Sequence, residues 1–403
     1  MEENPLIYDW NRVGNDPPER RRIEFDDETL RDGLQSPSVT TPSIEDRIAI
    51  LHLMVRLGID SADIGLPGAG PHVVEAVTAL AREIADSRLP IQPNCAARTL
   101  RADVQPIIDI SEKVGIPIEC CTFIGSSPIR QYAEDWTLDM MLRATEDAVT
   151  FAVSHGLPVM YVTEDTTRAH PDTLRKLYRT AIECGARRIC LADTVGHATP
   201  AGVRALVSFI KQVVAETGED VKIDWHGHND RGLSVINTIA AIEAGVDRVH
   251  GTALGIGERC GNTPMDQLLV NLTLMGYIER DLSGLNEYCQ TVSRACRVPI
   301  PFNYPVVGTD AFRTGTGVHA AAVIKAYKKN DIKLANTVYS GVPAHLFGLE
   351  QTIEIGPMSG KSNVIYWLEK RGIEPTEDRV ERIFAYAKSS PTILSEQEVM
   401  RLV

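Results

Sequence analysis

Residues 221–257 read VKIDWHGHNDRGLSVINTIAAIEAGVDRVHGTALGIG, and this stretch carries the pattern that decides the fold. A short apolar run ends in polar residues. An amphipathic stretch of helical period follows and closes on Gly245, and a second short run begins at Asp247. Glycine is the usual residue just past a helix C-terminus. This alternation of strand and helix indicates parallel strands joined by crossover helices.

The same alternation repeats along the chain between about residues 22 and 278. Eight short runs are expected to be strands, and they begin near Ile23, Asp60, Pro90, Pro117, Pro158, Arg187, Val221 and Asp247. Eight such units fit a closed (β/α)8 TIM barrel. The competing fold is an open doubly wound sheet, but the first run lacks the GxGxxG of its dinucleotide-binding form. The barrel interpretation places the chemistry at the C-terminal ends of the strands.

The chain is expected to have three segments. Residues 1–20 are predicted to be an N-terminal arm and residues 21–281 the barrel. After Leu282 the alternation stops, and helical patterns broken by the Pro-rich RVPIPFNYPVVG replace it. Residues 282–403 are therefore predicted to form a mainly helical accessory region.

Composition and charge exclude several classes of protein. The 403 residues carry a formal net charge of −13, which argues against nucleic acid as a partner. The first residues, MEENPLIYDW, lack the pattern of a secretory signal, and no apolar run is long enough to span a membrane. The eight cysteines show no CxxC spacing and are expected to be reduced thiols. Together these features predict a cytoplasmic protein.

The motif DWHGHND places His226 and His228 two residues apart at the end of the seventh predicted strand. Residues two apart on a strand point to the same face, so the two imidazoles project together. Two imidazoles on one face suit a divalent metal, and Asp230 just beyond is placed to orient them. The alternative is a pair of hydrogen-bonded polar side chains inside the barrel.

A carboxylate is expected as the third metal ligand. Asp32 is the candidate because it follows the first strand in DDETLRDGLQ and precedes the turn at Gly33. Asp26 and Asp27 are the alternatives. Only strand eight separates strands one and seven around a closed sheet, so their ends can meet over the barrel mouth.

Three further strand-end residues offer substrate-directed chemistry. Arg31 supplies a planar cation suited to a carboxylate or a developing enolate; its alternative role is a salt bridge to Glu28 or Glu164. At the fifth strand end, VTEDTTR offers Glu164 for proton transfer. At the sixth, LADTVGHATP offers the Thr194 hydroxyl for a substrate carboxylate.

The eighth strand ends in GIGERCGNTP. Asn262 in this loop is either a further ligand, the holder of a metal-bound water, or a helix N-cap. Glu258 and Arg259 are expected to form a buried pair that supports the site.

Taken together, these motifs resemble those of a known enzyme family. The motifs are TLRDGLQ, FIGSSPI, VTEDTTR, LADTVGHATP, HGHND and GIGERCGN. They resemble the metal-dependent acyl-CoA Claisen enzymes, a barrel family of 2-isopropylmalate, homocitrate and citramalate synthases, with hydroxymethylglutaryl-CoA lyase as a more distant relative. The resemblance is strong over about residues 22–278 and weaker over residues 282–370.

The resemblance implies a role for individual residues. The implied metal ligands are Asp32, His226, His228 and Asn262. The implied catalytic residues are Arg31, Glu164, His319 and Tyr339, and the implied substrate contacts are Arg31, Gln35, Thr194 and Asn94. The implied cofactor is divalent Mg²⁺, Mn²⁺ or Zn²⁺, with acetyl-CoA as co-substrate. His319, in TGTGVH, resembles a histidine that reaches the partner subunit's barrel, which implies a homodimer.

The implied reaction condenses acetyl-CoA with a 2-oxo acid and hydrolyses the thioester. The first choice of 2-oxo acid is 2-oxoisovalerate, giving 2-isopropylmalate for leucine biosynthesis; pyruvate, 2-oxoglutarate and an aryl pyruvate are the alternatives. A lyase that cleaves a C–C bond is a further alternative: Leu34 matches the lyases, whereas GERCGN and His319 match the synthases. A non-catalytic barrel would be expected to lack ligands that are all present here. Leucine-regulated members carry a further C-terminal domain, and with Val403 as the last residue we expect no regulation of that kind.

Overall fold

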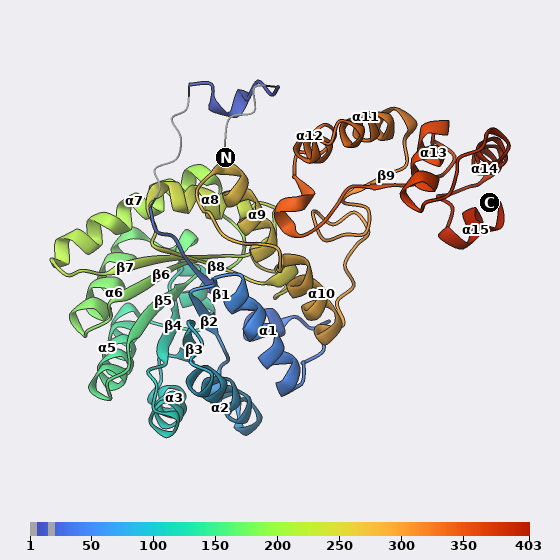
Figure 1. The fold of residues 1–403 in the computed structure, drawn as a ribbon. Helices are drawn as coiled ribbons and strands as arrows, with labels where there is room; N and C mark the ends of the chain where they lie inside the picture. Colours follow the sequence, from blue (N-terminus) through green and yellow to red (C-terminus); the bar gives the residue numbers. More distant parts are fainter. Residues whose placement is uncertain (1–5, 15–20) are drawn as a thin grey trace. The chain divides into compact units, whose positions relative to one another are not determined.

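The computed structural model describes residues 6–14 and 21–403, and its larger part is a closed barrel of eight parallel strands (Figure 1). The strands are β1 (Glu24–Asp27), β2 (Ser61–Asp63), β3 (Gln92–Arg98), β4 (Glu119–Gly125), β5 (Val159–Glu164), β6 (Arg188–Asp193), β7 (Lys222–Gly227) and β8 (Arg248–Gly251). They neighbour one another in sequence order, and β1 pairs with both β2 and β8, which closes the sheet. The predicted barrel is therefore confirmed.

Helices surround the barrel, and those that precede β8 connect its strands (Figure 1). They are α1 (Ile44–Arg56), α2 (Pro71–Asp86), α3 (Arg101–Val114), α4 (Pro128–Ala133), α5 (Leu138–Ser154), α6 (Pro171–Glu183), α7 (Pro200–Thr217), α8 (Ser234–Ala244), α9 (Met265–Met275) and α10 (Leu285–Cys296). Because the connections run through helices and all strands are parallel, the C-terminal ends of the strands share one rim.

Local sequence accounts for the helix ends. In α7, the Thr199 side chain accepts a hydrogen bond from the backbone N–H of Gly202, and Pro200 occupies the first helical position. The helix ends at Gly218, which has a left-handed backbone with φ of 72°. Glycine takes this conformation at little cost because it has no Cβ.

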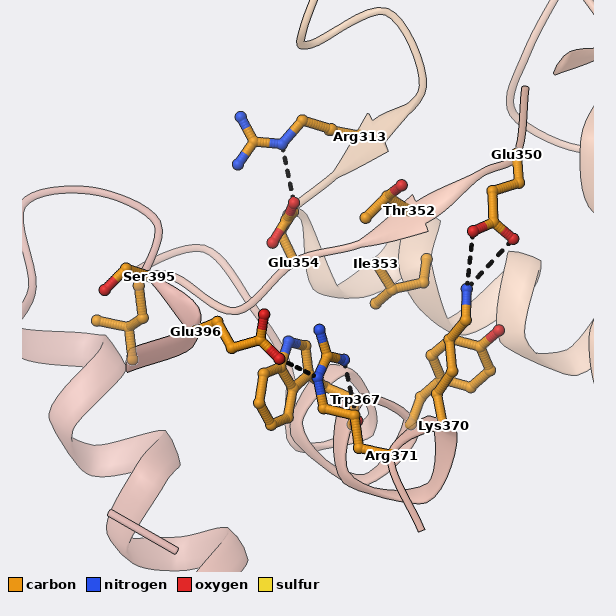
Figure 2. A pocket seen from close by; sticks show the side chains of 12 residues that line it. Arg313, Glu350, Thr352, Ile353, Glu354, Trp367, Lys370, Arg371, Ser395 and Glu396 are labelled. Carbon is orange, nitrogen blue, oxygen red and sulfur yellow. Dashed lines mark hydrogen bonds and ion pairs between the residues drawn. The ribbon is translucent and has the colours of Figure 1, made fainter. Parts of the chain in front are cut away.

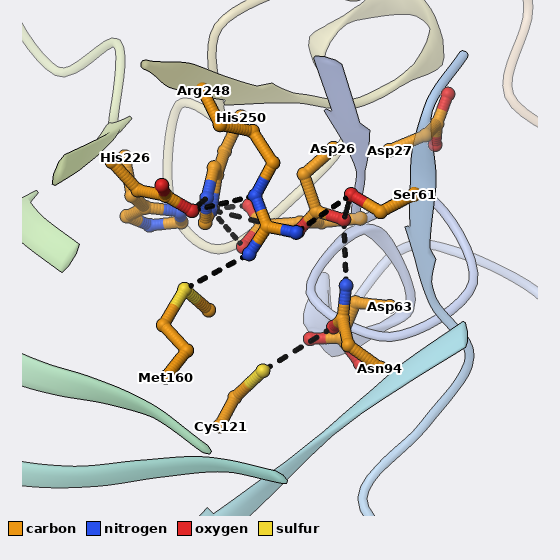
Figure 3. Close-up of polar contacts among 12 residues, drawn as sticks. Asp26, Asp27, Ser61, Asp63, Asn94, Cys121, Met160, His226, Arg248 and His250 are labelled. Carbon is orange, nitrogen blue, oxygen red and sulfur yellow. Dashed lines mark hydrogen bonds and ion pairs between the residues drawn. The ribbon is translucent and has the colours of Figure 1, made fainter. Parts of the chain in front are cut away.

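Charged side chains fill the barrel interior near the starts of the strands. Arg248, which is 1% exposed, donates to Asp224 and to Glu119, each at 2.6 Å; Figure 3 shows Arg248 among the polar contacts of the interior. Arg188 donates to Asp224 as well, at 2.7 Å. Burial opposes ionisation of Asp224, but the two arginines outweigh it and hold its pKa well below the usual value. These paired charges form an ionic layer beneath the rim.

The chain divides into two compact units. The barrel unit contains the described residues up to Arg280 together with Glu287–Val298, and the accessory unit contains Asp281–Asn286 and Pro299–Val403. Most of α10 belongs to the barrel unit, whereas the sequence pattern predicted that it belongs to the accessory region.

The accessory unit is mainly helical, as expected. Its elements are β9 (Arg313–Thr314), α11 (Gly317–Lys328), α12 (Ile332–Thr337), η6 (Ala344–Phe347), β10 (Thr352–Ile353), α13 (Lys361–Lys370), α14 (Glu377–Ser389) and α15 (Glu396–Arg401). One apolar cluster joins α11, α12 and β10, and a second joins α13, α14 and α15.

Of the expected N-terminal arm, residues 6–14 are described and contain the short turn η1 (Trp10–Arg12), whereas residues 1–5 and 15–20 lie outside the described residues. Among the helices of residues 6–14 and 21–403, none combines the length and the apolar character that crossing a membrane requires.

Candidate functional site

A cavity of about 130 Å³ opens at the C-terminal ends of the barrel strands. Its polar lining residues are Glu28, Arg31, Asp32, Gln35, Asp63, Glu164, Thr194, His226, His228, His250 and Glu258. Its apolar lining residues are Leu66, Ala96, Cys121, Phe123, Met160, Val162, Cys190 and Ala192. Barrel enzymes carry their active sites at this rim, so the cavity lies where the fold places chemistry.

Three potential metal ligands converge on the cavity. His226 is the penultimate residue of β7 and His228 comes just past the strand, two residues later, so both rings point to one face. Asp32 comes from the turn after β1, and its Oδ2 lies 3.5 Å from Nε2 of His228 and 4.0 Å from Nε2 of His226. One donor atom of each residue lies within 4.8 Å of the other two. The structure thus brings together the three residues that the sequence predicted as metal ligands.

The electrostatics of these residues suit a cation. Burial opposes ionisation of Asp32, but Arg31 and His226 outweigh it and hold the pKa of its carboxyl below the usual value. Burial, reinforced by His226, lowers the pKa of His228 to about 4. His228 is therefore neutral at pH 7 and offers a lone pair. Two imidazoles and one carboxylate are a donor set typical of Zn²⁺, Mn²⁺ and related divalent ions.

Unsatisfied polar atoms lie beside this donor set. Within the described part of the chain, Nδ1 of His228 and Oδ1 of Asn262 are buried and lack a hydrogen-bond partner. Nδ2 of Asn262 donates to Oδ2 of Asp32 at 2.6 Å, so this residue lies against the ligand set. Buried polar atoms without partners are rare in folded proteins. The residues present therefore fit a divalent cation.

Arg31 lies next to the ligand set and is held by three carboxylates. Its guanidinium donates to Asp32 at 2.6 Å, to Asp63 at 2.6 Å and to Glu28 at 3.3 Å. The pair with Glu28 is one of the two salt bridges considered from the sequence. Arg31 nevertheless lines the cavity, so its ion pairs fix the orientation of a cation that faces the cavity.

The alternative third ligands lie outside the donor set. Asp26 accepts hydrogen bonds from Ser61 at 2.5 Å and from Asn94 at 2.6 Å. Asp27 accepts from the backbone N–H of Thr29 and from the Tyr288 hydroxyl. Of the three carboxylates considered, Asp32 is the one that faces both imidazoles.

The predicted substrate contacts divide between the cavity and the barrel interior. Of the predicted substrate contacts, Gln35 and Thr194 line the cavity, and so does Glu164, which was predicted as a catalytic residue. Burial raises the pKa of Glu164 above its usual value. Asn94 is fully buried and donates to Asp26 from inside the barrel, and the structure does not bring it to the cavity wall.

The loop after β8 differs from expectation. Glu258 and Arg259 form the predicted ion pair, at 3.5 Å, but the prediction that it is buried is wrong, because their side chains are 50% and 40% exposed. Arg259 has a left-handed backbone with φ of 53°, and its guanidinium donates to Asp230 at 2.8 Å and to the Thr194 carbonyl at 2.6 Å. Asp230 is thereby paired with Arg259 and does not orient the histidines as expected.

The cavity lining also includes three residues that the sequence did not predict as site residues: Glu28, His250 and Asp63. Glu28 accepts hydrogen bonds from Nδ1 of His226 at 2.7 Å and from Nδ1 of His250 at 3.0 Å. The alternation of side chains along a strand, which places His226 and His228 on one face, also places Glu28 on the same face as Asp26. This pattern could have identified Glu28 as a site residue. The signal for Asp63 is its place at the end of the second strand run.

His319 and Tyr339 belong to the accessory unit. Their rings stack with centroids 4.1 Å apart and an interplanar angle of 27°, and both side chains are exposed. With Gln351 they line a cavity of about 220 Å³ in that unit. The structure thus shows the two predicted residues as an exposed pair.

A larger cavity, of about 570 Å³, lies within the accessory unit (Figure 2). Its charged side chains are already paired, Arg313 with Glu354, Lys370 with Glu350, and Arg371 with Glu396. Arg371 also lies over the Trp367 ring at 3.6 Å. Volume therefore does not identify the functional site, because the converging ligand atoms lie at the smaller barrel cavity.

Known protein sequences match most of the chain. A family model described as HMGL-like matches residues 22–292. Homocitrate synthase AksA of Methanopyrus kandleri is 35% identical over 367 residues, which cover 90% of this chain and 86% of the relative. A probable 2-isopropylmalate synthase of the same organism is 32% identical over 372 residues, which cover 91% of this chain and 69% of the relative.

Solved structures match the fold of the barrel. The HMG-CoA lyase of Bacillus subtilis superposes with a TM-score of 0.58 at 20% identity, covering 70% of this chain and 97% of the lyase. At that identity the likeness concerns the fold alone.

Proposed function

The chain belongs to the HMGL-like family, and from this premise we propose that it condenses acetyl-CoA with a 2-oxo acid and then hydrolyses the thioester. The observation that carries the proposal is the convergence of Asp32, His226 and His228 beside Arg31 at the rim of the barrel. Relatives named as homocitrate and 2-isopropylmalate synthases support this class of reaction.

The proposed cofactor is divalent Mg²⁺, Mn²⁺ or Zn²⁺, held by Asp32, His226 and His228 with Asn262 beside them. When bound, such an ion supplies Lewis acidity toward the keto and carboxylate oxygens of the 2-oxo acid. Arg31 is placed to offset the negative charge that develops as the carbon–carbon bond forms.

The reaction forms one C–C bond and breaks one thioester. A base removes a proton from the methyl carbon of acetyl-CoA, that carbon attacks the keto carbon of the 2-oxo acid, and the keto oxygen gains a proton to become a hydroxyl. Water then attacks the thioester carbonyl, so that CoA leaves as the thiol. Glu164 is the proposed base from the barrel, since burial raises its pKa toward the range useful at neutral pH.

His319 and Tyr339 of the partner subunit are proposed to take part in the proton transfers. Their stacked and exposed rings support this role, because such a pair is accessible to another chain. The assignment follows the family resemblance and requires a homodimer.

The cavity wall supports a 2-oxo acid with an apolar side chain. The ligand set and Arg31 come from β1, β7 and the residues after them, whereas β3 to β6 contribute Ala96, Phe123, Val162 and other apolar groups. Arg31 already pairs with three carboxylates and so offers little to a second substrate carboxylate. This arrangement favours 2-oxoisovalerate or pyruvate over 2-oxoglutarate.

The size of the cavity narrows the choice further. Its volume of about 130 Å³ is similar to that of a cavity that holds one benzene ring, about 150 Å³. The keto and carboxylate groups of the 2-oxo acid must share this volume with its side chain, so a short branched side chain fits better than an aryl group, whose ring alone would fill it. We propose 2-oxoisovalerate as the substrate and 2-isopropylmalate as the product, which places the reaction in leucine biosynthesis.

The test is thiol release from acetyl-CoA with a panel of 2-oxo acids, before and after removal of metal with a chelator. We expect 2-oxoisovalerate to give the highest kcat/KM, 2-oxoglutarate the lowest, and chelation to abolish release until metal is restored. His226→Ala should lose at least about 100-fold in kcat. The exposed His155→Ala is the matched control and should retain the wild-type rate.

Three results would count against the proposal. Chelator-insensitive thiol release would show that the reaction does not need a metal. A preference for 2-oxoglutarate would contradict the proposal that the pocket selects an apolar side chain. Formation of acetyl-CoA from a hydroxyacyl-CoA, without condensation, would identify a lyase instead.

A further inference from the structure

Glu28 accepts more hydrogen bonds from side chains than Asp32 or Asp63, the neighbouring carboxylates of the proposed metal site. It is 3% exposed and follows directly after β1. Its Oε2 accepts from Nδ1 of His226 at 2.7 Å and from Nδ2 of Asn262 at 3.4 Å. Its Oε1 accepts from Nδ1 of His250 at 3.0 Å and from Nη2 of Arg31 at 3.3 Å. Both oxygens are therefore occupied by donors from the site.

The contact with His226 decides which ring nitrogen faces the cavity. Because Nδ1 donates its hydrogen to Glu28, the lone pair of the neutral ring belongs to Nε2, which lies 4.0 Å from Oδ2 of Asp32. A ligating histidine is generally fixed in this way by a hydrogen bond on its other nitrogen.

We propose that Glu28 is the positioning residue of the metal site: it sets the tautomer and the orientation of His226 and at the same time fixes Arg31 beside the ligand set. The inference rests on the proposed function, since it requires that a cation binds to Asp32, His226 and His228.

Glu28 is itself held from the opposite side. His250 donates from Nδ1 to Glu28 and from Nε2 to Asp224, the latter at 2.9 Å, and its ring lies beside that of His226 with centroids 5.9 Å apart (Figure 3). Asp224 is paired in turn with Arg248 in the ionic layer. The position of Glu28 is thus tied to the rigid interior of the barrel rather than to a surface loop.

Glutamine cannot replace Glu28 in this network. The carboxylate accepts hydrogen bonds on both oxygens, whereas an amide has one acceptor oxygen and one donor nitrogen. In Glu28→Gln the amide nitrogen must therefore face a donor, either Nδ1 of His226 or Nδ1 of His250. His226 would have to turn or move its ring hydrogen to Nε2, or His250, which donates from both ring nitrogens, would have to turn or lose its Nδ1 hydrogen.

The experiment measures metal affinity rather than turnover. Metal-free wild type and Glu28→Gln are titrated with Zn²⁺ in competition with a chromophoric chelator, and with Co²⁺ to record its visible absorption. We expect one equivalent to bind to wild type, a 10- to 100-fold weaker affinity for Glu28→Gln, and a shifted Co²⁺ spectrum. Glu28→Asp retains two acceptor oxygens and should recover part of the affinity.

The matched control is Asp103→Asn. Asp103 is also buried, at 3% exposed, and it pairs with Arg98 at 2.7 Å without contacting the site. It should bind Zn²⁺ with wild-type affinity. If Glu28→Gln fails to fold, as judged by circular dichroism, Glu28→Asp carries the comparison, because its shorter side chain should still weaken binding and shift the spectrum.

Each remaining outcome overturns the inference in a different way. Equal Zn²⁺ affinity in wild type and both Glu28 variants would show that Glu28 only fills space, and the proposed function would stand. Two equivalents in wild type, one of them lost in Glu28→Gln, would make Glu28 a ligand of a second ion with His226 and His250, which also form a possible metal-holding group. If neither Zn²⁺ nor Co²⁺ binds to wild type, both the proposed function and this inference are contradicted.

Discussion

At the scale of single residues, surroundings rather than residue type decide what each carboxylate does. The stretch from Asp26 to Asp32, both included, contains four carboxylates, and all of them are buried. Asp26 accepts from Ser61 in the barrel interior, Glu28 accepts from two histidines, and Asp32 faces the imidazoles of β7. Asp27 has no counter-cation among its contacts in the described structure; a hydroxyl and a backbone N–H bind it instead.

Asp27 makes stability depend on pH. Burial raises its pKa from 3.8 to about 6, although hydrogen bonds from Thr29 and Tyr288 oppose the shift. The folded state therefore holds the proton more tightly than the unfolded state, and stability is lost as pH rises from about 4 to 6. Relative to Asp27→Asn, which cannot ionise, wild type should lose about 2–3 kcal/mol of unfolding free energy over that range.

The measurement is urea unfolding of both proteins between pH 4 and pH 8. Asp220→Asn serves as the control, since that side chain is 92% exposed and folding changes its surroundings little. A difference between wild type and Asp27→Asn that stays constant across the range would contradict the raised pKa.

At the scale of elements, one strand connects the floor of the barrel with the site at its rim. Asp224 and His226 lie two residues apart on β7 and share the interior face, and His228 continues the series just past the strand. Asp224 belongs to the ionic layer, whereas the two histidines belong to the ligand set. Helices α6 and α8 pack on either side of α7, so the cap of α7 affects the stability of this part of the barrel.

The N-cap of α7 provides a test at this scale. Thr199→Ala removes the side-chain oxygen that accepts from Gly202 and should cost about 1 kcal/mol of unfolding free energy. Ser208→Ala, at an exposed position within the same helix, should change stability by less than about 0.5 kcal/mol. Urea unfolding measures both, and equal effects of the two substitutions would show that the cap contributes nothing.

At the scale of the whole molecule, the proposed active site needs residues from two compact units. The ligand set belongs to the barrel unit, and His319 and Tyr339 belong to the accessory unit. If the accessory unit of one subunit serves the barrel of another, each site in a homodimer is shared between chains.

Mixing two inactive variants tests that sharing. His226→Ala and His319→Ala should each be inactive alone, but a mixture in which subunits exchange should regain activity. Random exchange makes half of the dimers mixed, and one of the two sites in each mixed dimer is intact, so about a quarter of the wild-type rate should return. Thiol release measures it, with mass determination to confirm exchange; exchange without recovery would place both residues in the same chain's site.

The sequence by itself predicted the architecture, which the structure confirms, and the three candidate metal ligands, which the structure brings together. Alternation of strand and helix predicted the barrel because parallel strands require crossover connections, and each strand begins within a few residues of its predicted run. The period of two predicted that His226 and His228 share a face, and closure of the barrel predicted that Asp32 meets them. These are local rules together with one topological rule, and both can be applied to a chain without coordinates.

Only the tertiary structure decided which partners each carboxylate binds by hydrogen bonds and ion pairs. Glu28 and His226 lie 198 residues apart in the chain, yet they form a hydrogen bond of 2.7 Å. Arg259 pairs with its neighbour Glu258 at 3.5 Å, but it also donates to Asp230 at 2.8 Å, a contact across 29 residues of chain. Contacts of this kind depend on distances below about 4 Å between strands and loops far apart in sequence, and the spacing of residues along one strand carries no information about them.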